Sequence, residues 1–144
     1  MQANAILETV LYGSDLETLE HFYLAIIGLK RIAATPGRNV VLQCGNSALI
    51  LFNAKASSQP GGMFPAHGTE GAGHIAFIIK EEELKTWRAH LAAKEVAIEK
   101  EVKWEEGGIS IYFRDPAGNS VELAPPTIWG GLGRRLLGNS STNY

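Results

Sequence analysis

Residues 112–126, YFRDPAGNSVELAPP, decide the fold of this chain. Apolar and polar side chains alternate over residues 109–114, which predicts a half-buried strand. The segment DPAGN at 115–119 supplies turn residues, because proline fixes φ while glycine and asparagine tolerate positive φ. A second strand is predicted over residues 120–124, and two prolines end it. The stretch is therefore a strand, a turn and a second strand.

Glu122 is the residue of this hairpin that points to chemistry. Successive side chains of a strand face opposite ways, so Val121 and Leu123 share one face and Glu122 lies on the other. The two apolar neighbours define the core face. A carboxylate on the opposite face stands where a ligand site can be built.

Composition limits the possible classes of protein. The 144 residues are 45% hydrophobic and 19% charged, which is typical of one globular domain or two small modules sharing a core. A net charge of −2 and a pI near 6.1 argue against binding to nucleic acid or anionic membranes. The single cysteine, Cys44, excludes an intramolecular disulfide or a cysteine-based metal cluster. With no visible signal peptide or membrane span, we expect a soluble cytoplasmic protein.

The first third of the chain predicts one strand, one helix and three more strands. Alternation over residues 5–12 predicts a strand, and Ser14 with Glu17 forms a capping-box pattern that predicts the start of a helix. Apolar residues then recur at three- and four-residue spacing, and Gly28 is the expected C-cap. The three strands are predicted over residues 29–34, 39–43 and 47–52.

The same order recurs after a connector. Residues 55–73 are rich in proline, glycine and serine and show no periodicity, which indicates a linker that can fold over a site. A strand is then predicted over residues 74–80, a helix over 81–94, and strands over 96–101, 109–114 and 120–124. The triplet Gly-Asn-Ser at 45–47 also repeats at 118–120. An internal repeat of this size indicates two related modules.

The order and spacing of three stretches resemble the vicinal oxygen chelate superfamily, also called the glyoxalase/bleomycin resistance/dioxygenase group. These stretches are LETVLYGSDLETLEHFYLAIIGLK, GHIAFII and YFRDPAGNSVEL. The resemblance implies an α+β fold of two βαβββ modules that form a cup-shaped mixed sheet. It also implies a single domain over residues 1–144, built of module one (about 5–54), the linker 55–73, module two (about 74–126) and a tail (127–144).

The resemblance also implies where a metal would bind. The family's ligand positions on the first strand of each module fall on Glu8 and His74, and the carboxylate on the last strand falls on Glu122. The fourth position corresponds, through the Gly-Asn-Ser repeat, to Leu49, which cannot ligate. Independently, alternation places Glu8, His74 and Glu122 on the strand faces opposite the better apolar stripes.

Two carboxylates and one imidazole suit a divalent ion such as Mn²⁺, Fe²⁺, Ni²⁺, Zn²⁺ or Mg²⁺. Such an ion would polarise a substrate carbonyl. The alternative is a hydrogen-bonded polar cluster in a metal-free cup. Glu8 is either a ligand or an unligated general base, and the catalytic candidates are Glu8, Glu122 and Tyr112, which is either a hydrogen-bond donor to substrate or a filler of the cup.

The function expected from this resemblance is that of a metal-dependent enzyme acting on a small substrate with vicinal oxygens, of the lyase, isomerase or dioxygenase type. The alternative is a metal-free protein that binds a small molecule, as bleomycin-resistance proteins do. Tyr12, Tyr112 and His67 are the candidate substrate-binding residues, although a loop histidine is more often simply solvated. We expect a homodimer, with the tail as a candidate contact, and no nucleic-acid or membrane partner.

Overall fold

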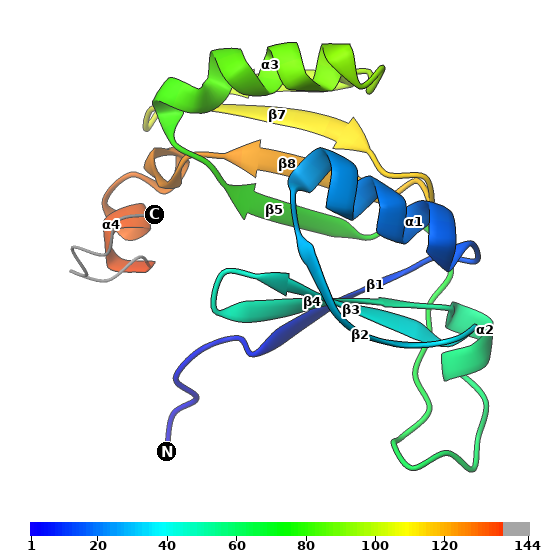
Figure 1. Ribbon diagram of the computed structural model, residues 1–144. Helices are drawn as coiled ribbons and strands as arrows, with labels where there is room; N and C mark the ends of the chain where they lie inside the picture. The colour runs from blue at the N-terminus through cyan, green and yellow to red at the C-terminus, as the bar shows by residue number, and fades with distance from the viewer. Residues whose placement is uncertain (137–144) are drawn as a thin grey trace. The chain divides into compact units, whose positions relative to one another are not determined.

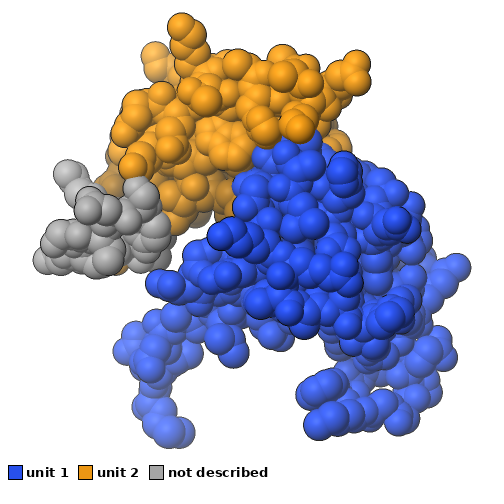
Figure 2. All heavy atoms as spheres, viewed as in Figure 1, with its two compact units in different colours: residues 1–73, 115–119 blue, residues 74–114, 120–144 orange. Residues whose placement is uncertain are grey.

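The computed structural model describes residues 1–136, which belong to two compact units. Unit 1 comprises residues 1–73 and the turn 115–119, and unit 2 comprises residues 74–114 and the chain from residue 120 (Figure 2). Each unit contains one four-stranded sheet with parallel and antiparallel pairs. The predicted α+β fold of two βαβββ modules is therefore confirmed.

The first sheet has the strand order β1-β4-β3-β2, with β1 parallel to β4 and the other neighbours antiparallel. Its strands are β1 (Glu8–Tyr12), β2 (Lys30–Thr35), β3 (Asn39–Cys44) and β4 (Ser47–Phe52). The α-helix α1 (Leu16–Phe22) and the π-helical turn η1 (Tyr23–Ile27) connect β1 to β2, and the short helix α2 (Ala54–Ser57) follows β4 (Figure 1).

The ends of the first helix show local sequence control. Asp15, not the predicted Ser14, caps α1: its carboxylate accepts hydrogen bonds from the backbone N–H (3.1 Å) and the hydroxyl (2.7 Å) of Thr18. The capping-box prediction was therefore one residue early. At the other end Gly28 adopts φ 80°, which confirms it as the left-handed cap.

The core of unit 1 lies between α1–η1 and one face of the sheet, where α1 packs on β3 and β4. Its fully buried side chains are Leu19, Tyr23, Leu42, Leu49 and Leu51. Burying each leucine contributes about 1.5–3 kcal/mol relative to leaving it exposed. The core face of β4 therefore carries Leu49 and Leu51.

The second sheet repeats this topology with the order β5-β8-β7-β6, and β5 is parallel to β8. Its strands are β5 (His74–Ile78), β6 (Lys100–Lys103), β7 (Ile109–Arg114) and β8 (Ser120–Ala124). Figure 1 shows α3 (Leu84–Ala93) along this sheet; the 3₁₀ turn η2 (Glu81–Glu83) precedes it, and η3 (Pro126–Trp129) and α4 (Gly131–Leu136) follow β8. Residues 137–144 of the predicted tail lie outside the described part of the chain. No helix among residues 1–136 has the length and apolar character needed to cross a membrane.

The strand predicted over residues 96–101 begins later, at Lys100. The backbone N–H groups of Glu95 and Val96 donate to the carbonyls of Ala92 and Leu91, so these residues close the helix. Glu95 takes a left-handed conformation with φ 57°, the role that Gly28 fills in unit 1. Because Glu95 and Val96 are used to end the helix, β6 starts later in the chain than predicted.

The turn 115–119 is held by the buried carboxylate of Asp115. Backbone N–H groups of Ala117 and Asn119 donate to it at 2.9 Å, the Asn119 side-chain amide donates at 2.8 Å, and the Tyr23 hydroxyl donates at 2.9 Å. Burial, and then the nearby Asp115 charge, raise the pKa of Tyr23 far above its usual value. Four donors satisfy this carboxylate, so Asp115 has a structural role.

Candidate functional site

Strand pairing in unit 2 places three predicted site residues on one face of the sheet. In the antiparallel pair of β7 and β8, Tyr112 is the partner of Glu122. In the parallel pair of β5 and β8, Ala76 is the partner of Glu122, and His74 lies two residues earlier on the same face. The opposite face carries the buried Val121 and is the core face. The predicted position of Glu122, opposite the core stripe, is confirmed.

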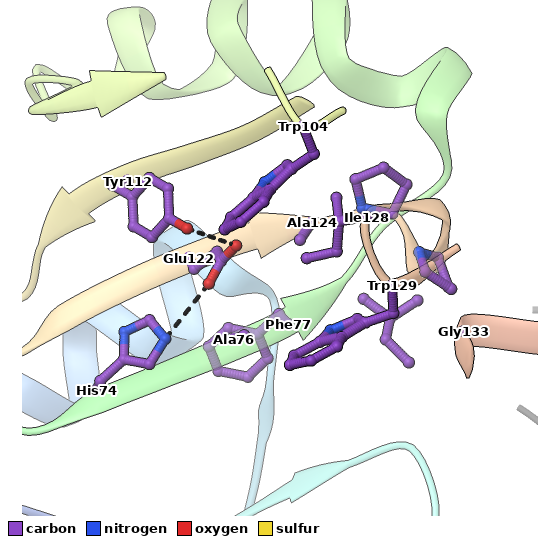
Figure 3. A pocket seen from close by; sticks show the side chains of 13 residues that line it. His74, Ala76, Phe77, Trp104, Tyr112, Glu122, Ala124, Ile128, Trp129 and Gly133 are labelled. Carbon is purple, nitrogen blue, oxygen red and sulfur yellow. Dashed lines mark hydrogen bonds and ion pairs between the residues drawn. The ribbon is translucent and has the colours of Figure 1, made fainter. Parts of the chain in front are cut away.

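The side chains of His74 and Tyr112 converge on the Glu122 carboxylate (Figure 3). The hydroxyl of Tyr112 donates to Oε1 of Glu122 at 2.9 Å, and Nε2 of His74 lies 3.3 Å from Oε2. The side chain of Glu122 is only 7% exposed, whereas that of His74 is 52% exposed. Glu122 therefore forms the floor of the cluster, and His74 forms its solvent-facing side.

The buried carboxylate needs electrostatic compensation, because transferring an isolated charge from water to the interior is costly. His74 is the only basic residue among the described residues that line the surrounding cavity. Burial, together with the hydrogen bond to Glu122, raises the pKa of Tyr112, so its phenol stays protonated and donates at neutral pH. Within unit 2 the partners available to compensate Glu122 are the neutral phenol of Tyr112 and the imidazole of His74.

The cluster lines a cavity of about 710 Å³, within the range of small-molecule sites. The rest of its wall is largely apolar and comes from β5, the β6–β7 connection, the end of β8, η3 and α4. These wall residues are Ala76, Phe77, Ile78, Trp104, Ala124, Pro125, Pro126, Ile128, Trp129 and Gly133. The sequence did not predict Trp104 as a site residue, and it suggested Trp129 only as part of the tail.

A second polar pair lies in unit 1. A hydrogen bond of 2.7 Å joins the Tyr12 hydroxyl to Nδ1 of His67, and the His67 ring meets Phe52 edge-on with centroids 4.6 Å apart. The backbone N–H of His67 also donates to the Ser57 carbonyl, so this part of the connector is anchored. The structure thus brings together two of the predicted substrate-binding residues, Tyr12 and His67. Tyr112, the third, belongs to the cluster in unit 2.

Glu8 begins β1 in unit 1 and is exposed. Within the described part of each unit, no group of three or more His, Cys, Asp or Glu side chains is close enough to hold a metal ion. An imidazole beside a carboxylate is nevertheless a chemically suitable part of a divalent-metal site. Glu8 as the third ligand stays a prediction.

The register corrects the position expected for a fourth ligand. Leu49 is paired with Thr9 and is 1% exposed on the core face, so it cannot correspond to Glu122. Ile50 is the matching residue, because it pairs with the third residue of β1 as Glu122 pairs with the third residue of β5. Alignment of the two Gly-Asn-Ser triplets placed the matching position one residue too early. The connections before the two last strands differ in length, because two residues connect β3 to β4 and five connect β7 to β8. Isoleucine cannot ligate either.

Comparison with known proteins agrees with this architecture. The family model of the Glyoxalase/Bleomycin resistance protein/Dioxygenase superfamily matches residues 5–123. The chain belongs to this superfamily. Among curated proteins, no sequence matched.

Solved structures show the same fold. A lactoylglutathione lyase from Agrobacterium tumefaciens is 38% identical, with a TM-score of 0.86, over 90% of this chain and 99% of that chain. A superfamily protein from Nocardioides is 22% identical, with a TM-score of 0.70, over 87% and 85% of the two chains. A mutant of the fosfomycin resistance protein FosX from Listeria monocytogenes, complexed with Mn(II) and dihydroxypropylphosphonic acid, is 21% identical, with a TM-score of 0.65, over 86% and 90%. The last two likenesses show the fold alone.

Proposed function

We propose that this protein is a metal-dependent enzyme that acts on a small substrate with two neighbouring oxygen atoms. The observation that carries the proposal is the His74–Glu122 pair, 3.3 Å apart, on the wall of a cavity of about 710 Å³. Imidazole and carboxylate are ligands that borderline and hard divalent ions share. Placed on a cavity wall, the pair is accessible to both an ion and a substrate.

His74 and Glu122 would hold the ion, with Glu8 as the proposed third ligand. Mn²⁺, Fe²⁺, Ni²⁺, Zn²⁺ and Mg²⁺ suit such a set of ligands. A bound ion would supply Lewis-acid polarisation of the substrate oxygens. Tyr112 holds the Glu122 carboxylate by its Oε1 while His74 lies beside Oε2, and a hydrogen bond of this kind orients a carboxylate that binds a metal.

The chain's own groups would handle binding and protons. Glu8 and Glu122 are the carboxylates proposed to carry a proton to or from substrate. Tyr112, whose pKa is raised, keeps its proton and can donate a hydrogen bond to a substrate oxygen in place of Glu122. Tyr12 and His67 are proposed to contact substrate.

Among the reaction types of the superfamily, we propose a lyase or isomerase. The 38% identity over nearly the full length of a lactoylglutathione lyase supports this choice. Ile50 supplies no fourth ligand, so the substrate of that relative is not assigned to this chain. A dioxygenase reaction is less well supported because Glu8 replaces the second histidine of the two-histidine, one-carboxylate set.

A metal-free binding protein is the second candidate. Both oxygens of Glu122 already have partners within the chain, and most of the cavity wall is apolar. Such a pocket can hold a small molecule without an ion. Measuring bound metal therefore separates the two functions.

The test is elemental analysis of protein purified without an affinity tag, before and after incubation with Mn²⁺, Fe²⁺, Ni²⁺ or Zn²⁺ and gel filtration. About one divalent ion per chain is expected in the wild type, and much less in His74→Ala and Glu122→Ala. His21→Ala, which changes an exposed histidine of α1, is the control and should bind the ion normally. A wild type that retains no ion would overturn the enzyme proposal and leave the binding protein.

The number of domains and of subunits is also proposed. We propose that residues 1–144 form one domain and that the protein is a homodimer, with the described part of the tail (127–136) as a candidate contact. Leu132, which is exposed there and is not among the residues that line the cavity, is the apolar residue that supports this contact. Sedimentation analysis should give twice the chain mass for wild type; a monomer at micromolar concentration would contradict the dimer.

A further inference from the structure

We propose that the cavity of unit 2 contains a subsite for a planar aromatic ring, which binds between the indoles of Trp104 and Trp129. The ring would belong to the substrate, whose neighbouring oxygens would point toward His74 and Glu122. The inference rests on the proposed function only in taking this cavity as the substrate site. It names a substrate class: a small molecule with an aromatic ring beside its vicinal oxygens.

The first observation is exposure. Trp104, Trp129 and Ile78 are 38%, 59% and 60% exposed, and all three line this cavity. Exposing apolar surface costs about 25 cal/mol per Å², so large apolar side chains gathered around one hollow mark a binding site. In Figure 3 the indoles of Trp104 and Trp129 are drawn on two sides of the cavity, and that of Trp104 is the nearer to the Glu122 carboxylate.

The second observation is that the Trp104 ring is held in place. Its Nε1–H donates to Oγ of Ser110 at 2.8 Å, and Ser110 is fully buried on β7. This bond occupies the polar edge of the indole and leaves its faces available. Ser110 lies two residues before Tyr112 and therefore on the same face of the strand. The strand that presents Tyr112 to Glu122 thus also orients Trp104.

The third observation is that the two segments carrying the tryptophans pack closely. A Cβ added at Gly108, which has φ 80°, would lie 2.7 Å from Oγ1 of Thr127 and 2.9 Å from Cγ of Pro125. A Cβ at Gly130 would lie 2.7 Å from Oε2 of Glu106. Glycine at both positions lets the β6–β7 connection, which carries Trp104, approach η3, which carries Trp129.

The chemistry of the wall selects a flat neutral group. Offset or edge-to-face contact between an indole and an aromatic ring stabilises binding more than burial of the same apolar area alone would. The polar end of the cavity is the proposed place of a divalent cation, and that cation, once bound, disfavours a positively charged ligand. A puckered aliphatic ring of similar size would bury similar area but would lack the aromatic contact.

The test compares two probes that differ only in their ring: 1-phenylethane-1,2-diol and 1-cyclohexylethane-1,2-diol. Affinities are measured by calorimetry on the full chain, both metal-loaded and after chelator treatment. The wild type is expected to favour the phenyl probe about tenfold. Trp104→Leu and Trp129→Leu should each reduce this preference to about threefold or less; Ser110→Ala should reduce it partly, because the Trp104 ring then turns freely.

Tryptophan fluorescence supplies an independent readout, since the chain has only three tryptophans. Binding of the phenyl probe between Trp104 and Trp129 should change the tryptophan fluorescence. Trp87 lies on α3 and is not among the cavity residues, so Trp87→Phe is the control. This variant should keep both the fluorescence change and the preference for the phenyl probe. Equal affinity of the two probes for wild type, or an unchanged preference in Trp129→Leu, would overturn the inference. Trp129 is exposed, so that variant should fold even if Trp104→Leu does not.

Failure of this inference differs from failure of the proposed function. A protein that binds a divalent ion but shows no phenyl preference keeps the proposed metal site and has a different substrate class. A protein that binds no ion but shows a preference that depends on both tryptophans has the aromatic subsite without the proposed metal chemistry.

Discussion

The two sheets share one strand order and one pairing pattern, yet their faces opposite the core carry different side chains. In unit 2 Tyr112 pairs with Glu122, and the matching pair in unit 1 is Val41 with Ile50. Ile50 is 9% exposed and Glu122 is 5% exposed, so both positions are buried. The fold therefore accepts an aliphatic residue at this position. Burying a carboxylate there has a cost, which supports the proposed role of Glu122 as a ligand over a role in folding.

The strongest test of this comparison places the residue of unit 1 into unit 2. Glu122→Ile should lower the affinity for Mn²⁺ by more than about 100-fold, because it removes a proposed ligand of the ion and not merely a side chain that orients one. Its unfolding free energy should stay within about 2 kcal/mol of wild type, since the lost hydrogen bond is partly offset by apolar burial. Calorimetric titration with Mn²⁺ and urea unfolding measure the two effects. Ile50→Val is the control, and an unfolded Glu122→Ile would show instead that the carboxylate is structural.

The loops before the last strands form the next contrast. Residues Gly45 and Asn46 alone connect β3 to β4, whereas the turn 115–119 is locked by the Asp115 carboxylate and its four donors. Asp115→Ala should lower the unfolding free energy by about 2–3 kcal/mol, because buried donors lose their acceptor. Asn46→Ala, at an exposed position, should change it by less than about 0.5 kcal/mol. Urea denaturation gives both values; equal effects would deny the special role of Asp115.

Tyr112 can lose a proton, whereas Val41, its counterpart in unit 1, cannot. The contribution of Tyr112 to stability should therefore depend on pH. The folded-state pKa of Tyr112 lies above its unfolded value of about 10, because burial and the bond to Glu122 favour the neutral phenol. Its stabilisation, about 1 kcal/mol, is therefore fully present below pH 10 and is lost as pH rises through the folded-state pKa. The stability difference between wild type and Tyr112→Phe should be constant from pH 7 to 9 and shrink above pH 10. A difference that grows above pH 10 would contradict this assignment.

The helix ends give the smallest expected effect. Gly28 ends the helical segment of unit 1 with φ 80°, and Glu95 holds a comparable position in unit 2 with φ 57°. A residue with a Cβ is strained in this conformation, so Glu95→Gly should raise the unfolding free energy by up to about 1 kcal/mol. Gly28→Ala should lower it by a similar amount. Thermal unfolding of both variants provides the check, and a destabilised Glu95→Gly would mean that contacts of the glutamate outweigh its strain.

Local patterns predicted most of the elements. The bounds of β4, β7 and β8 agree with the prediction, because a period of two and the turn residues are written in adjacent positions. The same period placed Glu122 opposite the core and Tyr112 beside it. The predicted start of β6, at residue 96, was wrong. The backbone hydrogen bonds of Glu95 and Val96 close the preceding helix, and the residue types in this segment do not reveal them.

The sequence by itself determined the order of elements that repeats in the two modules and the faces of their strands, because these follow from short-range periodicity. The ligand positions came from the resemblance to the superfamily, and they remain proposals. Only the tertiary structure decided which residues meet. Strand register replaced Leu49 by Ile50 as the counterpart of Glu122. Packing of the β6–β7 connection against η3 brought Trp104 and Trp129 to one cavity. Register and loop packing depend on contacts between residues far apart in the chain, and no local pattern encodes them.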